Sequence, residues 1–474
     1  MTLPIPPLRQ ADLPERDKSF WKMAGPGAIM VGLAIGSGEL VLWPWITAKF
    51  GAQMMWAAAV GVFLQMWLNI EIGRWAIATG ESAFTGLARL SRFWVHFWLI
   101  LLIGYAFLPG FGLAAGLALK MLLFGVDGPG PDWMWAAIVL VGALAILLSS
   151  ERIYQSVERT VVFLVVVIVV GLIIVASSIG TAADVSAMVS GTLNFGHIAL
   201  DDEFTFDRFF GAIAFAGAGG YGNLLYAYYL RDKGIGMGKR IPPLLNPLRQ
   251  TQLGASEIGY VFQPDAENMR RFRDWFRFVL LDTSLCFWLL NTFTMFLFMF
   301  GALVVLFPRG IVPEQGQLLW DLATILESTM GAGGRTLFLV IGFAALFSSI
   351  FGGLDGGGRL WVDLLHTNFA FAQRIAANRL YLGFAVGLTV IGIFATWLFG
   401  TYDVGALDFF FIGAAITGFS MAGYVPMVLY LNLKYLPPAA RPGPVNIFMM
   451  SIASLTYISF AIYTVWSKIA EWLA

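Results

Sequence analysis

The chain alternates long apolar runs with short polar connections, a pattern that predicts a helical membrane protein. A run of about 20 apolar residues crosses the ~30 Å hydrocarbon core of a bilayer as a helix. Eleven runs approach this length, as two groups of five followed by one more. They cover Ala24–Thr47, Ala52–Ile77, Phe93–Leu123, Trp133–Leu148 and Thr160–Ser178; then Phe206–Leu230, Phe276–Phe307, Thr336–Phe351, Leu380–Phe399 and Leu407–Leu431; and finally Asn446–Trp466. We therefore expect an all-α integral membrane protein with eleven transmembrane helices.

The Lys and Arg residues are distributed very unevenly between the two sets of connections. If the N-terminus is cytoplasmic and the runs alternate in direction, 23 of the 29 basic residues fall on the cytoplasmic side. Cytoplasmic connections of membrane proteins carry such an excess, whereas the opposite topology would violate the rule. We therefore expect a multi-pass protein of the cell inner (plasma) membrane, in contact with lipid, with a cytoplasmic N-terminus.

Composition narrows the function classes. Hydrophobic residues make up 58% of the chain and charged residues 12%, which excludes an ordinary soluble domain. The sequence has no Gly-x4-Gly-Lys-Ser/Thr nucleotide loop, and its three histidines lie near run ends or in connections. We expect no enzyme, no cofactor and no nucleic-acid partner. The single cysteine, Cys286, leaves no intrachain disulfide, and we expect a monomer.

Glycine-rich interruptions occur at the same place in each five-run group. The first run contains Gly36-Ser37-Gly38-Glu39, and the sixth contains Ala216-Gly217-Ala218-Gly219-Gly220-Tyr221-Gly222-Asn223. Interrupted spans at matching positions are typical of transporters built from inverted repeats, which bind substrate between the repeats. We therefore predict two inverted five-helix repeats, in which helices 1 and 6 are broken.

The expected domain organisation follows from this pattern. Residues 1–23 form a cytoplasmic tail, and residues 24–440 form the transporter core, with repeats at about 24–180 and 206–432. The core includes a cytoplasmic insert at 231–275 that is rich in Arg, Pro and Gln. Residues 441–474 contain the eleventh helix and the C-terminus.

Glu39 is the central candidate for binding. A carboxylate at mid-membrane depth costs roughly 2.5–3.5 kcal/mol on insertion scales, so such residues usually serve a function. Broken helices expose backbone carbonyls that attract cations and N–H groups that attract anions. The predicted substrate-binding residues are Gly36, Ser37, Glu39, Gly217, Gly220, Tyr221 and Asn223, and the predicted pathway residues are Gln65, Asn69, Tyr226, Thr417 and Ser420.

At these residues the chain resembles the Nramp (natural resistance-associated macrophage protein) family of metal transporters. The resemblance is carried by Gly25-Pro26-Gly27, the first interruption, Ala48-Lys49-Phe50-Gly51, Ile77-Ala78-Thr79-Gly80, the second interruption, Ser348-Ser349 through Gly353, and Pro426. It covers most of the chain. It implies the family's fold, within the amino acid–polyamine–cation superfamily, and transport of a divalent metal ion by alternating access.

The residues that would bind the metal depart from the family pattern. The family's Asp-Pro-Gly-Asn reads Gly36-Ser37-Gly38-Glu39 here, and its Met-Pro-His reads Gly220-Tyr221-Gly222. No sulfur or imidazole ligand remains for a soft metal. Glu39, the carbonyls of Gly36 and Gly217, and Asn223 form an oxygen set, which suits a hard or partly hydrated ion such as Mg²⁺ or Mn²⁺.

Two alternatives remain open at this point. Glu39 together with Tyr221, Tyr226 and Tyr228 is a candidate cage for the ammonium group of a small organic amine or amino acid. Loss of the family's Asp, Met and His also fits a sensor that no longer transports.

Ion pairs are expected at two further places. In the second run, Glu71 is expected to pair with Arg74 at the cytoplasmic boundary. Asp355, in a predicted glycine-rich turn at Gly352–Gly358, is expected either to be a turn residue or to pair with Arg359.

Overall fold

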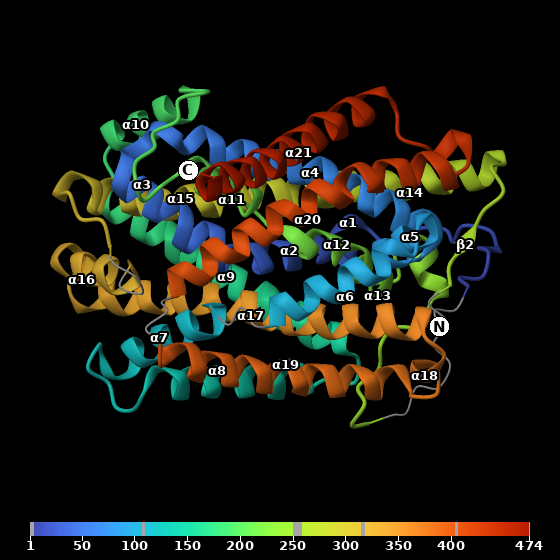
Figure 1. The fold of residues 1–474 in the computed structure, drawn as a ribbon, viewed down its shortest axis with the longest axis horizontal. Coiled ribbons are helices and arrows are strands. Elements are labelled where there is room, and N and C mark those ends of the chain that lie inside the picture. The colour runs from blue at the N-terminus through green and yellow to red at the C-terminus, as the bar shows by residue number, and fades with distance from the viewer. Residues whose placement is uncertain (1–3, 107–109, 250–257, 314–317, 403–405, 474) are drawn as a thin grey trace.

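The protein is a bundle of long helices, seen here in a computed structural model that describes residues 4–106, 110–249, 258–313, 318–402 and 406–473 (Figure 1). The helices of the first half are α1 (Phe20–Met23), α2 (Pro26–Ala34), α3 (Trp43–Phe50), α4 (Met55–Thr79), α5 (Ala83–Leu90), α6 (Phe93–Ala106), α7 (Gly110–Phe124), α8 (Asp132–Leu147), α9 (Ile153–Ile179) and α10 (Ala182–Leu193). Those of the second half are α11 (Phe206–Ala214), α12 (Gly220–Leu224), α13 (Tyr226–Asp232), α14 (Ala266–Leu281), α15 (Leu290–Val305), α16 (Leu318–Met330), α17 (Ala332–Asn368), α18 (Ala370–Gln373), α19 (Ala377–Gly400), α20 (Ala406–Tyr435) and α21 (Pro444–Leu473).

Most helices run along one common direction, and α17 runs along much of the bundle next to α8 and α19 (Figure 1). It packs against α9, α16, α7 and α19, while α20 packs against α21. Helices α8 and α19 lie side by side along one edge (Figure 1). Outward-facing apolar side chains cover α9 and α19, among them Phe163, Val170, Val390 and Phe394. Apolar surface of this kind is expected where helices face lipid.

Seven helical stretches of the described residues are long and apolar enough to cross a membrane. These are Gly38–Thr79, Ile153–Ile179, Ala266–Arg309, Ala332–Asn368, Ala377–Gly400, Phe409–Tyr435 and Pro444–Ser467. Three shorter apolar helical stretches, Phe93–Ile103, Gly112–Phe124 and Asp132–Leu147, accompany them. The chain is therefore a multi-pass membrane protein, while the count of eleven spans stays a prediction.

Capping residues at several helix ends determine where these helices begin or end. Gly80 adopts the left-handed conformation at the end of α4, with φ 75°, which a residue without Cβ does readily. The Ser82 hydroxyl accepts the Thr85 N–H and caps α5. Asp265 caps α14 by accepting the N–H of Asn268, and this bond together with the Asn268 side-chain amide lowers the pKa of Asp265.

The predicted glycine-rich turn at Gly352–Gly358 is wrong. These residues lie inside α17, which runs unbroken for 37 residues. Glycines permit close packing of neighbouring helices, and this explains their presence here. A Cβ at Gly352 would strike Leu33, and one at Gly358 would approach Tyr381 at 2.8 Å. The prediction failed because glycine is both a turn residue and a packing residue.

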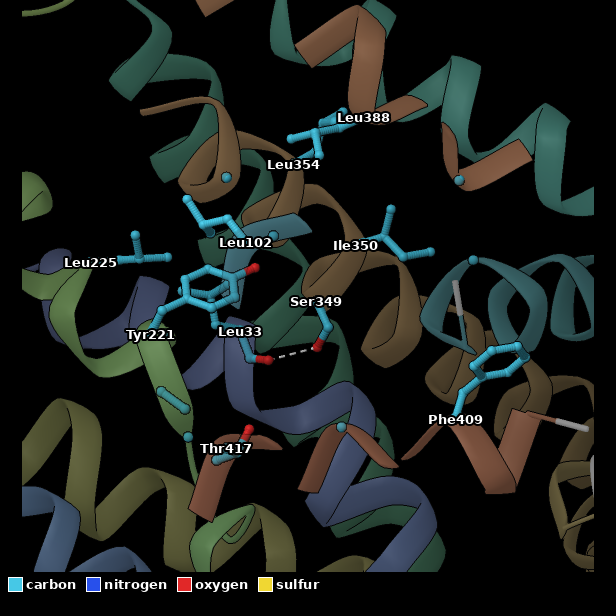
Figure 2. Close-up of a pocket in the computed structure, with 18 of the residues that line it drawn as sticks. Leu33, Leu102, Tyr221, Leu225, Ser349, Ile350, Leu354, Leu388, Phe409 and Thr417 are labelled. Carbon is cyan, nitrogen blue, oxygen red and sulfur yellow. Dashed lines mark hydrogen bonds between the residues drawn. The ribbon is translucent and has the colours of Figure 1, made fainter. Parts of the chain in front are cut away.

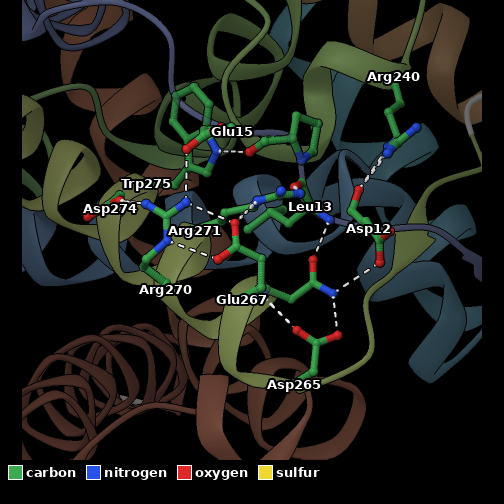
Figure 3. Close-up of polar contacts among 12 residues, drawn as sticks. Asp12, Leu13, Glu15, Arg240, Asp265, Glu267, Arg270, Arg271, Asp274 and Trp275 are labelled. Carbon is green, nitrogen blue, oxygen red and sulfur yellow. Dashed lines mark hydrogen bonds and ion pairs between the residues drawn. The ribbon is translucent and has the colours of Figure 1, made fainter.

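The N-terminal segment is bound to the insert and to α14. Strand β1 (Arg9–Gln10) pairs in parallel with β2 (Tyr260–Val261). Leu13 is fully buried, and its N–H donates to the Asn268 side chain at 2.8 Å. Trp275 donates to the Pro14 carbonyl at 2.7 Å, and Arg270 pairs with Glu15 at 2.9 Å (Figure 3). These contacts hold the tail and the insert together at one end of the bundle.

Candidate functional site

The first glycine-rich interruption does not break its helix. Residues Ile35–Leu42 form π-helical turns that join α2 to α3 without an unwound segment. The prediction of a broken first helix is therefore wrong: the helix is continuous and has wider, π-helical turns at this place. π-Helical turns bond i to i+5 and are found frequently at functional sites.

Two serines of α17 supply partners for this part of the backbone. The Gly36 N–H donates to the Ser349 hydroxyl at 2.9 Å. The Ser349 hydroxyl in turn donates to the Leu33 carbonyl at 2.8 Å, and the Ser348 hydroxyl donates to the Gly32 carbonyl at 2.7 Å. A Cβ at Gly36 would collide with Ser349, so glycine is required for this close approach.

The second interruption does break its helix. Helix α11 ends at Ala214 and α12 begins at Gly220, and Gly217 and Gly219 between them have φ of 130° and 46°. Residues other than glycine rarely adopt backbone angles of this kind. The predicted break in this span is confirmed.

Gln65 of α4 satisfies both sides of the break. Its amide nitrogen donates to the carbonyls of Ala214 and Ala216 at 3.0 and 3.1 Å. Its amide oxygen accepts the Gly219 N–H at 3.0 Å and the Asn223 side-chain amide at 3.1 Å. Gln65 is thus the hydrogen-bond partner of the broken backbone, and its predicted place along the pathway stays a prediction.

The two interrupted segments touch. A Cβ at Gly38 would overlap the Phe215 carbonyl, so glycine lets the π-helical turns approach the end of α11. Glu39, the next residue, is 0% exposed. Its Oε2 accepts the hydroxyl of Thr294 on α15 at 2.6 Å, whereas Oε1 has no hydrogen-bond partner among the described residues. No Lys, Arg or His among the described residues forms an ion pair with Glu39.

The contact with Thr294 turns Glu39 toward α15. Thr294 is a site residue that the sequence did not single out, although a threonine in an apolar span is a signal that could have found it. Asn291 lies one turn before it, fully buried, with neither side-chain amide atom hydrogen-bonded to any described residue. Helix α15 thus presents two buried polar side chains near the carboxylate.

A chamber of about 190 Å³ lies beside these segments (Figure 2). It is bounded by Leu33 of α2, by Phe215 and Tyr221 on either side of the break, by Ser349 of α17 and by Thr417 of α20. Helices α6, α7, α8 and α19 complete the wall. Of the described residues that line it, none is Glu39 or Asn223, and none is an Asp, Glu, Lys, Arg or His.

The remaining predicted site residues differ in their surroundings and hydrogen-bond partners. The Asn223 amide oxygen and both amide atoms of Asn69 are buried without a hydrogen-bond partner among the described residues. The Gly220 carbonyl accepts the Tyr424 hydroxyl at 2.6 Å. The Ser420 hydroxyl donates to the Thr417 carbonyl within α20. The Ser37 side chain lies outside the described residues.

The proposed tyrosine cage is wrong. The Tyr226 hydroxyl donates to Asp282 at 2.8 Å, and the Tyr228 hydroxyl donates to Asp363 at 2.6 Å. Neither of them lines the chamber, whereas Tyr221 does. Successive positions on a helix point in different directions, so these rings bind to different neighbours.

Two ion pairs that were predicted from the sequence are present in the structure. Arg74 donates to Glu71 at 2.9 Å, as predicted. Asp355 pairs with Arg359 at 2.9 Å, which confirms the second of the two roles considered for it. Arg359 also pairs with Asp232 at the end of α13, and Tyr381 of α19 donates to Asp355 at 2.8 Å. This cluster joins α17, α13 and α19.

Removing the Ser349 hydroxyl is expected to weaken the fold around the π-helical turns. Ser349→Ala leaves the Gly36 N–H and the Leu33 carbonyl without this partner, and a buried unsatisfied group costs about 1–3 kcal/mol. The free energy of unfolding in mixed detergent measures the effect. Ser177→Ala, an exposed serine of α9, is the matched control, and an equal loss in both variants would contradict the assigned role.

Solved structures share the fold of this chain at low sequence identity. No protein-family model matches the chain, and no curated protein matches it. Solved structures similar to it include a mutant form of the manganese transporter of Eremococcus coleocola, with TM-score 0.67 and 16% identity over 98% of this chain and 91% of that one.

Two further transporter structures are similar over most of their length. Mhp1, a nucleobase-cation-symport-1 family transporter with bromovinylhydantoin bound, has TM-score 0.54 and 14% identity, over 93% of this chain and 92% of Mhp1. MhsT in complex with L-phenylalanine has TM-score 0.51 and 14% identity, over 94% of this chain and 99% of MhsT. The chain has the fold that these transporters share.

Proposed function

We propose that the protein is a secondary transporter that works by alternating access and binds a cation at Glu39. The observation that carries this proposal is the state of the Glu39 carboxylate, which is fully buried with one oxygen on Thr294 and the other without a partner among the described residues. A buried ionised carboxylate without a counter-charge is strongly disfavoured. A cation next to Oε1 would supply that counter-charge.

The proposed cargo is a divalent metal ion of the hard or partly hydrated kind, similar to Mg²⁺ or Mn²⁺. Two buried oxygens, Glu39 Oε1 and Asn223 Oδ1, accept no hydrogen bond from the described residues and are available as ligands. The carbonyls of Gly36 and Gly217 are the further proposed ligands. The fold shared with a manganese transporter over 98% of the chain supports a metal as cargo.

The ligand set leaves a large part of the coordination shell to water. Among the described residues, no group of three or more His, Cys, Asp or Glu side chains is placed to hold a metal ion. Mg²⁺ usually keeps several waters and binds proteins through one or two carboxylates. A site with one carboxylate therefore suits a partly hydrated ion better than a bare one.

The proposed setting is the cell inner membrane with a cytoplasmic N-terminus, eleven spans and two inverted repeats. The segment from Arg231 to Arg277, with its many basic residues, packs with the N-terminal tail at one end of the bundle. An excess of Lys and Arg at one end supports placing that end in the cytoplasm.

Uptake into proteoliposomes tests the proposal. Purified protein is reconstituted with a fluorescent Mn²⁺ or Mg²⁺ indicator inside, and protein-free liposomes serve as the control. We expect ion entry that saturates with concentration and exceeds the control. Entry equal to that of empty liposomes for both ions would contradict transport of a divalent cation and would favour the sensor.

A further inference from the structure

The chamber and the Glu39 carboxylate face different neighbours of the first helix. Leu33 lines the chamber and Gly36 contacts Ser349 of α17, whereas Glu39 contacts Thr294 of α15. The chamber is also lined by Phe215, whose carbonyl lies against Gly38. A ligand in the chamber would therefore be adjacent to the cation at Glu39 without sharing its carboxylate.

The lining of the chamber does not suit an ion. The described residues of its wall include no charged side chain, and their side-chain oxygens are three hydroxyls, of Tyr221, Ser349 and Thr417. The Ser349 hydroxyl is already engaged with the Gly36 N–H and with the Leu33 carbonyl, and Figure 2 shows the second of these bonds. Stripping an ion of water is costly unless oxygen ligands replace the hydration shell, and this wall is mostly hydrocarbon.

The same lining suits a small apolar group. Five aromatic rings contribute to the wall, those of Phe215, Tyr221, Trp361, Phe409 and Phe410. Aromatic side chains favour offset-stacked and edge-to-face contacts with another ring. Trp361 is held by stacking on Phe384, with centroids 5.1 Å apart and planes 7° from parallel, so this part of the wall is preformed.

The size of the chamber indicates what kind of group it accommodates. A dry cavity of about 150 Å³ lined by Leu, Ile and Phe holds a benzene molecule. The chamber here measures about 190 Å³, which leaves room for one ring, or one branched aliphatic group, with a short polar chain. The side-chain oxygens that such a chain would meet in the wall are the hydroxyls of Tyr221, Ser349 and Thr417.

We propose that the chamber binds a small organic solute with an aromatic or branched aliphatic body, as a second site next to the cation at Glu39. This inference rests on the proposed function, because it assigns the two adjacent sites to two ligands carried in one transport cycle. It also gives the organic cargo considered from the sequence a definite place. That place is formed by the chamber wall and not by a tyrosine cage around Glu39.

Gly353 of α17 offers a direct way to fill the chamber. Gly353 lines it, and a Cβ built there meets no described atom within 4 Å. Leucine is also a better helix former than glycine, so Gly353→Leu is expected to fold. Gly383→Leu is the matched control, because Gly383 is an exposed glycine of α19 whose Cβ likewise meets nothing within 4 Å in the described structure.

The experiment measures binding of L-phenylalanine, L-leucine, phenylethylamine and glycine to purified protein in the presence of Mn²⁺. We expect at least one of the first three probes to bind saturably, while glycine, which has no apolar body, binds at least tenfold more weakly. Gly353→Leu should weaken the binding probe at least tenfold, and Gly383→Leu should leave it within twofold of wild type.

Several results would overturn the proposal. Binding that survives Gly353→Leu would place the probe outside the chamber, and equal binding of glycine would remove the apolar requirement. If Gly353→Leu does not fold, Gly222→Ala takes its place, since its Cβ would make only an ordinary contact with Ala218 at 3.6 Å. Normal Mn²⁺ uptake with no probe bound would refute the chamber site and leave the cation transporter standing.

Discussion

Replacing Glu39 with glutamine is expected to abolish saturable uptake of Mn²⁺ and Mg²⁺. Glutamine has nearly the same shape and retains an oxygen for the Thr294 hydroxyl, which donates to Glu39 at 2.6 Å. It carries no charge, so it cannot offset the cost of removing a cation from water. We expect initial uptake rates to fall at least a hundredfold. The amount of purified protein and its elution profile should remain those of wild type.

The control for this variant is Glu151→Gln. Glu151 is a carboxylate whose side chain is 73% exposed and lies 3.9 Å from Arg249, so losing its charge should leave uptake within twofold of wild type. A Glu39→Gln variant that folds and transports either ion at the wild-type rate would remove Glu39 from the mechanism. The proposed cation site at Glu39 would then be refuted.

The second large effect is expected at Arg359, where it acts on stability. Its side chain is 1% exposed and lies between two carboxylates that are 0% exposed, those of Asp355 and Asp232. Arg359→Met keeps most of the side-chain volume and removes the charge. Asp355 then loses its cation, while Asp232 retains Arg231 at 3.3 Å. Breaking a buried pair in this way costs about 3–5 kcal/mol.

Unfolding in mixed detergent measures this loss. Arg374→Met is the control, because Arg374 is exposed after α18, and we expect a change of less than about 0.5 kcal/mol there. Adding Asp355→Asn to Arg359→Met should restore part of the stability, since the Asp355 carboxylate is then no longer a buried charge without its cation. Equal stability of Arg359→Met and wild type would contradict the role assigned to this cluster.

Several helix boundaries could be predicted to within a few residues. The predicted spans Trp133–Leu148 and Leu380–Phe399 correspond to α8 (Asp132–Leu147) and α19 (Ala377–Gly400). In both cases an uninterrupted apolar run is bounded by polar residues or proline, so the length of the run fixes the helix. The break between α11 and α12 was equally visible, because four glycines occur within six residues there.

The direction of the Glu39 side chain could not be predicted. Its contact with Thr294 joins positions 255 residues apart, and only the packing of the first helix on α15 determines it. The role of Gln65 depends in the same way on how α4 lies against the break. Both residues were recognised as polar groups in apolar spans, while their partners had to come from the tertiary structure.

The difference between π-helical and unwound backbone was also beyond the sequence. Gly36 and Gly38 permit either conformation. The structure has π-helical turns there because Ser348 and Ser349 meet the backbone from α17. The same two serines were noticed only for their resemblance to a family, which gave no reason for their position.

The most direct test of the central claim is the position of a bound metal ion. Crystals soaked in Mn²⁺ allow an anomalous difference map, in which Mn²⁺ appears as a peak that lighter atoms do not produce. We expect a peak within bonding distance of Glu39 Oε1 that is absent from Glu39→Gln crystals. A peak inside the apolar chamber, or Mn²⁺ bound solely at surface carboxylates such as Asp201 and Glu203, would contradict it.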